Sequence, residues 1–346
     1  MAKKTVRVGV IGCGAIGQRR HLPEYAARDD VELVGVCDIK FPRAKAAAKT
    51  FGAPKAFKNH KDLLKLAPDA ISVCTPNYLH APQSLDALRA GCHVLCEKPM
   101  AGSVKDAKAM IAAAKKARRQ LMIGQNQRLA PAHVRGKELY KSGIVGKALG
   151  FSTSFAHPGP ESWSMDGEDG FFFKKRQAII GSLGDLGVHK IDLVRWFLDD
   201  EVVLAGAMTA TLDKANCTVD DTAYGVFTMK SGIIGQMFAG WILKAGEANG
   251  TTVCCEKGVI KLFEDPDYTV VVLKADGEKM FIQSGAIQTN EEGGQTSSGV
   301  IDAFVESLKS GRKVPIPGEE GARSLAAIMA CVDSARTKKF VRPAKV

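Results

Sequence analysis

The first third of the chain alternates short apolar runs with Ala- and Lys-rich segments, and this alternation limits the fold more than any other feature. The expected strands are Val6–Ile11, Val31–Cys37, Lys55–Phe57, Ala70–Cys74, His93–Cys96 and Leu121–Ile123. The expected helices are Ala15–Ala27, Arg43–Thr50, Lys61–Leu66, Ala81–Ala90 and Val104–Arg119. Strands separated by helices pair in parallel through right-handed crossovers. The pattern therefore predicts a doubly wound parallel sheet over residues 1–125.

The pattern changes near Gln125–Pro131, after which β-rich stretches follow one another with short, Gly-containing connections. The expected strands are Ala148–Phe155, Val202–Ala210, Ala223–Met229, Ile233–Trp241, Thr251–Cys255, Val259–Phe263 and Thr269–Leu273. The expected helices are Ala132–Lys141, Leu186–Leu198, Ser298–Ser310 and Gly321–Thr337. Consecutive strands predict antiparallel pairing. Because 346 residues suffice for two domains, we expect an α/β chain whose second domain, residues 126–346, is α+β with a large, open, mainly antiparallel sheet.

A glycine-rich turn of the form GxGxxG lies where the first expected strand meets the first expected helix. Gly12 would make the tight turn, Gly14 would let the backbone approach a pyrophosphate, and Gly17 would let helix and strand pack closely. The motif is weak in isolation, but its position between a strand and a helix favours a dinucleotide site over a structural turn. The residues predicted to bind the cofactor here are Gly12, Gly14, Ala15, Ile16 and Gly17.

The residues after the second expected strand bear on which dinucleotide binds. Asp38 ends that strand 21 residues after Gly17, where a carboxylate accepts hydrogen bonds from the adenosine ribose and repels a 2′-phosphate. Lys40 and Arg43 follow closely and could accept that phosphate. The sequence thus predicts NAD as the cofactor and leaves NADP possible.

Two loops follow later strands of the parallel sheet, at the edge where such sheets bind ligands. The first is Thr75-Pro76-Asn77-Tyr78-Leu79-His80, whose turn-forming residues are common in loops of any kind. The second is Glu97-Lys98-Pro99. A residue before proline is kept out of helical geometry, so Lys98 would be aimed by the turn and could hold a substrate hydroxyl. The alternative interpretation is a solvated loop lysine.

A histidine and two carboxylates share one face of the expected helix in the second domain. Asp185 and His189 are four residues apart, and Asp192 is three beyond His189. A nearby carboxylate raises the pKa of a histidine and orients its ring, so His189 is a candidate base for a hydroxyl proton. On spacing alone, an N-capping aspartate beside a structurally satisfied histidine is the favoured interpretation.

The net charge of +11 raises the question of nucleic-acid binding. Residues 1–125 hold 22 Lys and Arg against 10 Asp and Glu, whereas the remainder holds 26 against 27. The basic residues are scattered along expected helices with few aromatic residues between them, which favours solvated helix faces over a nucleic-acid surface. We therefore expect no nucleic-acid partner.

The cysteines and the apolar runs bear on the cellular compartment. Nine cysteines occur without a CxxC motif or paired metal-ligand spacing, so no metal site is expected and free thiols are predicted. No apolar run is long enough to span a membrane, and the start leads directly into a strand without a secretory segment. These features predict a cytoplasmic protein without a membrane partner.

Taken together and in order, these motifs resemble the Gfo/Idh/MocA family of oxidoreductases. The resemblance rests on the GxGxxG turn, the Thr-Pro-Asn-x-x-His loop, Glu-Lys-Pro and the Asp-x-Gly-x-His-x-x-Asp helix, and it extends to the closing helices. It implies an N-terminal Rossmann domain, tightly held NAD(P), a cis peptide before Pro99, and a homodimer or homotetramer formed through the C-terminal sheet. The implied activity is hydride transfer between NAD(P) and a secondary hydroxyl or ketone of a sugar, glycoside or cyclic polyol such as inositol.

The resemblance also assigns roles to residues at matching positions. Lys98 and His189 become the catalytic pair, with Asp185 in support. Further cofactor contacts implied or predicted are Asp38, Thr75, Pro76, Asn77, His80, Glu97, Lys98 and Asn126. Candidate substrate contacts are Lys98, Arg128, His157, Trp163, Lys175, Asp185 and His189.

Two segments depart from the usual family pattern, namely Gly181-Ser182-Leu183-Gly184 and the aromatic, basic run Phe171–Arg176. Both lie where the substrate is selected, so no individual substrate is assigned. Two alternatives stay open: an enzyme whose bound NAD is transiently reduced during elimination or glycoside cleavage, and a non-catalytic NAD-sensing regulator. The retained Lys98, Asp185 and His189 argue against the regulator, because a sensor needs no proton relay.

Overall fold

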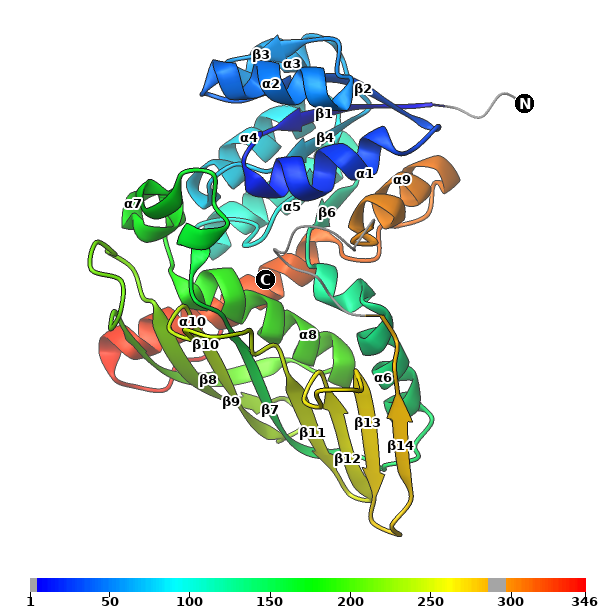
Figure 1. The fold of residues 1–346 in the computed structure, drawn as a ribbon, viewed down its shortest axis with the longest axis vertical. Coiled ribbons are helices and arrows are strands. Elements are labelled where there is room, and N and C mark those ends of the chain that lie inside the picture. The colour runs from blue at the N-terminus through cyan, green and yellow to red at the C-terminus, as the bar shows by residue number, and fades with distance from the viewer. Residues whose placement is uncertain (1–4, 286–296) are drawn as a thin grey trace.

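Two sheets organise the chain in the computed structural model, which describes residues 5–285 and 297–346 (Figure 1). Within that part, one sheet has six strands in the order β3-β2-β1-β4-β5-β6, and every neighbouring pair is parallel. Its strands are β1 (Val6–Ile11), β2 (Val31–Cys37), β3 (Ala56–Phe57), β4 (Ala70–Val73), β5 (His93–Cys96) and β6 (Leu121–Ile123). The strand order with β1 at the centre confirms the doubly wound sheet that the sequence predicts.

Helices connect the strands of this sheet. They are α1 (Leu22–Ala26), α2 (Phe41–Phe51), α3 (His60–Leu64), α4 (Asn77–Arg89) and α5 (Val104–Ala117). α4 begins at Asn77, so the predicted start at Ala81 is wrong, and Pro82 lies inside the helix. The predicted helix Ala15–Ala27 is confirmed as a continuous helical stretch over residues 15–26, with a wider π-type segment at Gly17–His21.

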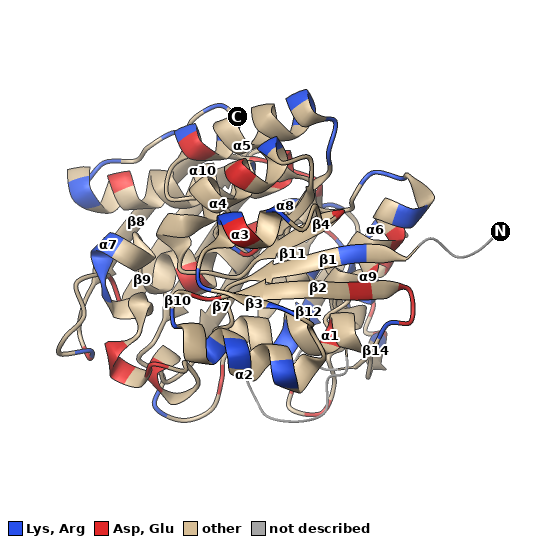
Figure 2. Ribbon diagram, turned by 90° about the horizontal axis from the view of Figure 1, so that it is seen from above, with Lys and Arg blue, Asp and Glu red and all other residues tan. Residues whose placement is uncertain are grey.

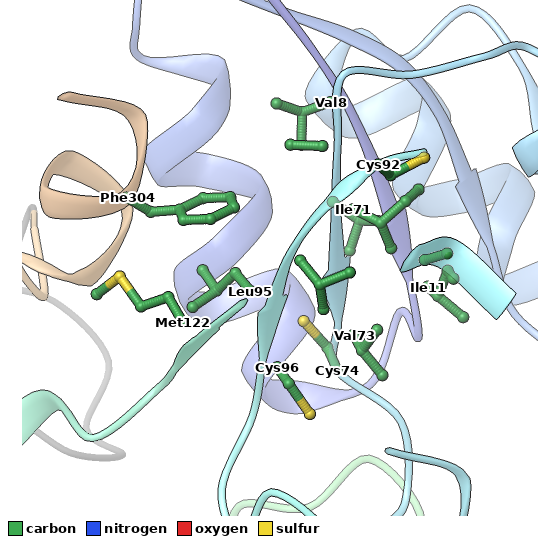
Figure 3. Close-up of a cluster of buried hydrophobic side chains, with 14 of the residues drawn as sticks. Val8, Ile11, Ile71, Val73, Cys74, Cys92, Leu95, Cys96, Met122 and Phe304 are labelled. Carbon is green, nitrogen blue, oxygen red and sulfur yellow. The ribbon is translucent and has the colours of Figure 1, made fainter. Parts of the chain in front are cut away.

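The parallel sheet buries apolar side chains from distant parts of the sequence (Figure 3). Val8, Ile71 and Leu95 are fully buried, as strands covered on both faces require. Phe304 of α9 (Val300–Ser310) joins the same cluster. The C-terminal segment thus returns to cover the first sheet, although the sequence assigned it to the second domain; the boundary near residue 125 remains a prediction.

The second sheet has eight strands in the described residues, in the order β14-β13-β12-β11-β7-β10-β9-β8. They are β7 (Ala148–Ala156), β8 (Val202–Ala210), β9 (Thr222–Met229), β10 (Ile234–Gly240), β11 (Thr251–Cys255), β12 (Gly258–Leu262), β13 (Val270–Lys274) and β14 (Lys279–Ile282). Neighbouring strands are antiparallel except for the parallel pair β7–β10. The mainly antiparallel sheet is therefore confirmed. The sequence analysis missed the edge strand β14, because Lys279 within it and Gly277 just before it interrupt the apolar pattern.

Helices cover one face of the second sheet and leave strands β9 and β10 exposed on the other (Figure 1). The covering helices are α6 (Pro131–Lys141), α8 (Val188–Leu198) and α10 (Gly318–Thr337), and a short helix, α7 (Lys175–Ala178), lies beside α4. Tyr224, Val226 and Ile234 are exposed on the open face. Among the described residues, no helix combines the length and apolarity that a bilayer crossing requires.

The excess of positive charge lies on the exposed faces of the first domain's helices. Lys45 and Lys49 on α2 and Lys105 and Lys108 on α5 are all exposed, and Figure 2 shows Lys and Arg along α2. This placement agrees with the predicted solvated helix faces.

Candidate active site

A cavity of about 1320 Å³ lies between the carboxyl edge of the parallel sheet and the second domain. Its walls come from both: the turns after β1, β2, β4 and β5 on one side, and the segment 155–177 with the start of α8 on the other. The carboxyl edge of a doubly wound sheet is where such folds bind nucleotides. The cavity therefore joins the predicted cofactor turn to the predicted catalytic residues.

The glycine turn has the geometry that a dinucleotide needs. Gly12 has a φ of +98°, and a Cβ there would lie 2.5 Å from the carbonyl oxygen of Cys74. A Cβ on Gly17 would lie 2.5 Å from the carbonyl oxygen of Gly12, so both positions are closed to larger residues. A Cβ on Gly14, by contrast, would meet no atom within 4 Å in the described part of the chain, and Gly14 lines the cavity together with Ala15 and Ile16. Gly14 keeps open the space through which a pyrophosphate approaches the backbone.

Asp38 lies at the far end of the cavity from Lys98, with its carboxylate fixed by backbone groups. Its Oδ2 accepts a hydrogen bond from the Cys13 N–H at 2.9 Å, and its Oδ1 accepts one from the Lys40 N–H at 2.8 Å. Each carboxylate oxygen has further lone pairs. A fixed carboxylate here suits the ribose hydroxyls of an adenosine.

Lys98 projects from the first domain onto Asp185, in the helical segment Leu183–Gly187 that leads into α8. Its Nζ donates to Asp185 Oδ1 at 2.7 Å and to the Asp185 carbonyl at 3.0 Å. The other carboxylate oxygen accepts from Trp241 Nε1 at 3.3 Å, and Trp241 is fully buried. The Lys98–Pro99 peptide is cis, as the resemblance implies. The lysine is thus a positioned ammonium group and not a solvated loop side chain.

His189 lines the cavity beside this ion pair, but Asp185 does not act on it as predicted. Asp185 is engaged by Lys98 and Trp241, while the His189 ring packs 5.8 Å from that of Phe155 and its Nδ1 has no hydrogen-bond partner among the described residues. Burial lowers the pKa of His189 well below its ordinary value of 6.5, and the charges of Lys98 and Lys190 lower it further. The expectation that Asp185 raises this pKa is therefore wrong. The ring is neutral and able to accept a proton.

Glu97 is held in a buried network that the sequence analysis did not foresee. Its Oε1 lies 2.9 Å from His21 Nε2, and its Oε2 accepts from the Lys98 N–H at 3.1 Å. Burial would raise the pKa of Glu97, but His21 and Lys98 lower it below its ordinary value. His21 Nδ1 lies 3.2 Å from Ser72 Oγ on β4. The network ties the glycine-turn helix to the loop that carries Lys98.

The Thr-Pro-Asn-x-x-His motif, which ends in the first turn of α4, lines the cavity and is fixed by hydrogen bonds to neighbouring segments. Asn77 Nδ2 donates to the Ala178 carbonyl of α7 at 2.8 Å. The ring nitrogens of His80 lie 2.8 Å from the Pro99 carbonyl and 2.7 Å from the Thr75 carbonyl, and burial lowers the pKa of this histidine. Thr75, Pro76, Asn77, His80 and Glu97 all line the cavity. His80 links this loop to the cis-proline turn.

Three residues predicted to contact ligands lie in the cavity wall, and each has a buried polar atom without a hydrogen-bond partner in the described residues. Asn126 Oδ1, His157 Nε2 and Trp163 Nε1 are buried without a partner in residues 5–285 and 297–346. His157 Nδ1 accepts from the Gly159 N–H at 3.0 Å, and burial lowers the pKa of His157. Buried polar atoms are rarely left unsatisfied in a working protein. These atoms mark where a polar ligand would bind.

Arg128 does not reach the cavity, so its predicted contact with substrate is wrong. Its guanidinium donates to Asp192 at 2.6 and 2.7 Å and to Glu320 at 3.0 Å, and Arg128 is 5% exposed. The same pairing turns Asp192 away from the face shared by Asp185 and His189, contrary to prediction, and Ser324 donates to Asp192 as well. Arg128 is a buried structural cation between α8 and α10.

Lys175 is also misplaced by the sequence analysis. It is exposed at the start of α7 and is not part of the cavity wall, whereas its neighbour Lys174 is. In a short helix adjacent residues point in different directions, so an error of one residue moves the side chain out of the site.

Comparisons with known proteins agree with this geometry. Residues 6–125 match the model of an oxidoreductase family with an NAD-binding Rossmann fold, and residues 133–261 match a GFO/IDH/MocA C-terminal domain. The first match defines the class, an NAD-binding oxidoreductase. With both regions matched, the chain belongs to the GFO/IDH/MocA family.

Relatives in this family act on several carbohydrates. The chain is 29% identical to D-glucoside 3-dehydrogenase of Escherichia coli K12, over 78% of this chain and 80% of that one. It is 26% identical to myo-inositol 2-dehydrogenase of Thermotoga maritima, over 97% and 98% of the two chains. A levoglucosan dehydrogenase complex with NADH and L-sorbose has the same fold, with a TM-score of 0.87, 24% identity and coverage of 99% and 100%.

The residues of the cavity fit NAD. The open side of Gly14 and the fixed carboxylate of Asp38 suit its pyrophosphate and adenosine ribose. Asn126 Oδ1, which has no partner in the described residues, belongs to the same cavity wall as Lys98 and His189 and could accept a hydrogen bond from the nicotinamide amide.

Proposed function

We propose that this chain transfers hydride between NAD and a secondary hydroxyl, or the corresponding ketone, of a sugar, glycoside or cyclic polyol. The observation that carries the proposal is the juxtaposition of an ammonium group held at 2.7 Å by Asp185 with a neutral, buried His189, in the same cavity as the dinucleotide turn. The range of sugar and inositol dehydrogenases among the relatives supports the substrate class.

The residues of the chain would handle the proton and the oxygen, while bound NAD accepts or supplies the hydride. Lys98 donates a hydrogen bond to the reacting oxygen and stabilises negative charge that develops on it. The neutral ring of His189 accepts the hydroxyl proton in the oxidising direction and returns it in the reducing direction. Asp185 holds the lysine, so its role is to position Lys98 and not to activate His189.

The cavity wall supports a polyhydroxylated substrate. Trp163 Nε1 can donate, whereas His157 Nε2 can donate or accept according to its tautomer. Trp163 and Phe172 meet edge to face, with ring centroids 5.0 Å apart, and both line the cavity. Aromatic faces beside unsatisfied polar atoms match a sugar ring, which presents apolar C–H faces and hydroxyl edges.

Purified chain should be tested with NAD and NADP against cyclic polyols, free sugars and glycosides by following the absorbance of reduced nicotinamide. The spectrum before substrate is added shows whether cofactor is retained. We expect steady NADH formation with one of these classes. No NADH and no product with any class would contradict the proposal.

A second function is favoured by the loop that closes over the cofactor end of the cavity. Asp166 of this loop pairs with Lys40 and Arg43 of the first domain, which would hinder cofactor release. Such closure suits an enzyme that keeps its NAD and completes a redox cycle during elimination or glycoside cleavage. Product detected by mass without net NADH would identify this mechanism.

We also propose that the open face of the second sheet forms a homo-oligomer. Tyr224, Val226 and Ile234 are 56%, 45% and 60% exposed, and Tyr224 stacks on Phe238 with centroids 4.7 Å apart. An exposed apolar patch on paired strands is typical of an interface. Val226→Lys should shift the chain to monomers in sedimentation experiments, whereas an oligomer unchanged by it would exclude this face.

A further inference from the structure

A loop of the second domain reaches the adenosine end of the cavity and contacts the two basic residues that follow Asp38. Asp166 Oδ1 accepts from Lys40 Nζ at 2.6 Å and from Arg43 Nη2 at 2.6 Å. A further contact joins the same loop to the glycine-turn segment, from Gln18 Nε2 to Met165 Sδ at 3.2 Å. The loop is thus attached to the first domain at the position where NAD and NADP differ.

The three charged residues of this contact, Lys40, Arg43 and Asp166, lie in the cavity wall together with Asp38. The side chains of Arg43 and Asp166 are 17% and 33% exposed, so the pair is partly shielded from water. Burial would raise the pKa of Asp166, yet the two cations lower it below its ordinary value, so the carboxylate is ionised at neutral pH. A residue of the other domain therefore already offsets part of the positive charge that follows β2.

We propose that Asp166 is a specificity-determining residue that makes the chain select NAD over NADP. A 2′-phosphate needs cations beside the ribose, and Lys40 and Arg43, which follow Asp38 closely in the sequence and line the same cavity, are candidates for that role. Asp166 occupies both of them. An NADP phosphate would have to displace this carboxylate while it also faces Asp38. NAD carries no charge there and leaves the ion pairs intact.

Cofactor choice would then have two contributions, of which the first domain alone supplies one. Asp38 disfavours the 2′-phosphate directly, whereas Asp166 acts by withholding Lys40 and Arg43. Because Asp166 belongs to the loop that closes the cavity, cofactor selection is completed by the second domain. The inference concerns cofactor binding and is independent of the proposed substrate.

The test measures dissociation constants of NAD and NADP by calorimetry, with cofactor-free protein. Asp166→Asn frees both cations while keeping the size of the side chain. We expect its affinity for NADP to rise about tenfold, which corresponds to about 1.4 kcal/mol, with less than about a threefold change for NAD. Asp169→Asn is the matched control: it removes one charge from the same loop without touching Lys40 or Arg43, and it should leave the NAD-to-NADP ratio unchanged.

The double variant Asp166→Asn/Arg43→Ala tests the route of the effect. Since the gain in NADP affinity depends on a freed cation, the double variant should lose most of it. Adenosine 2′-monophosphate is a second probe, and it should bind more tightly to Asp166→Asn than to the parent chain. An unchanged ratio in Asp166→Asn, or an equal loss of affinity for both cofactors, would overturn the proposal and leave Asp166 as a structural latch. Because binding is measured without substrate, this result does not depend on whether the proposed reaction occurs.

Discussion

The two ends of the cavity handle charge in different ways. At the adenosine end, Asp38 is buried and fixed by backbone N–H groups, whereas the side chains of Lys40 and Asp166 are 57% and 33% exposed, so water weakens their ion pair. At the reaction end, Lys98 and Asp185 are largely enclosed and His189 is 8% exposed. Water is largely excluded there, and burial determines which groups carry charge. The comparison predicts that substitutions at the reaction end have large effects on catalysis, whereas those at the adenosine end adjust binding.

Replacement of the ammonium group at the reaction end should have the largest effect. Lys98→Ala removes the donor to the reacting oxygen and leaves the Asp185 carboxylate buried without its cation. We expect turnover to fall about 10²- to 10³-fold, since removing one positioned donor to a developing oxyanion costs about that much. NAD binding, measured by calorimetry, should persist. Lys174→Ala, a second lysine of the cavity wall, is the control, and comparable losses in both variants would refute a special role for Lys98.

Replacement of Arg128 tests whether a buried charge outside the cavity affects the stability of the fold without affecting substrate binding. Arg128→Ala leaves Asp192 buried without its bidentate partner, which costs about 3–5 kcal/mol in comparable cases. The free energy of unfolding in urea should fall by that amount, and the double variant Arg128→Leu/Asp192→Leu should recover part of it. A folded Arg128→Ala protein with unchanged stability and a raised KM would instead restore the predicted substrate contact.

Replacement of Gly14 tests whether the pyrophosphate of NAD binds at the glycine turn. A Cβ there meets no described atom within 4 Å, so Gly14→Ala should leave the unfolding midpoint nearly unchanged. It should weaken NAD binding about tenfold or more, because the methyl group enters the space of the pyrophosphate. Gly12→Ala is the contrast: its φ of +98° and the 2.5 Å approach to Cys74 should destabilise the fold itself. Equal NAD affinity in Gly14→Ala would exclude the proposed phosphate position.

The effect of burial on protonation should also appear in the pH dependence of stability. Burial lowers the pKa of His133 from 6.5 to about 3, so below pH 6.5 the unfolded chain binds a proton that the folded chain does not. Stability should therefore fall as the pH drops from 6.5 towards 3, by up to about 1.4 kcal/mol per pH unit from this group. His133→Asn should flatten this slope and leave the slope above pH 6.5 unchanged. An unaltered acid slope would mean that the ring is protonated in the fold.

Much of the fold could be predicted from local patterns. Apolar runs and their spacing locate strands such as His93–Cys96 and Val202–Ala210 to the residue. This is possible because the apolar pattern that marks a strand lies within the strand's own residues. The resemblance likewise identifies Lys98 and His189, which the cavity brings together.

The misplaced features depend on contacts between distant residues. Asp185 lies four residues from His189, yet it binds Lys98, which is 87 residues away in sequence. His21 and Asp166 belong to no motif and gain their roles from partners in other loops. The positive charge of Arg128 is compatible with ligand binding, but its partner in the structure is Asp192, which the packing of α8 against α10 places beside it. The fold thus follows from local sequence, whereas the charge state of the site follows from long-range contacts.

The most direct test of this account is the pKa of His189 in the folded protein. The ring resonances of histidine can be titrated by NMR, with the His189 signals assigned by their loss in His189→Gln. We expect the ring to stay neutral at pH 6.5 and to titrate well below it, with Asp185→Asn shifting the midpoint little because Asp185 is bound to Lys98. A midpoint at or above 6.5 that falls in Asp185→Asn would show that the aspartate activates the histidine, and it would contradict the central claim that burial keeps the base neutral.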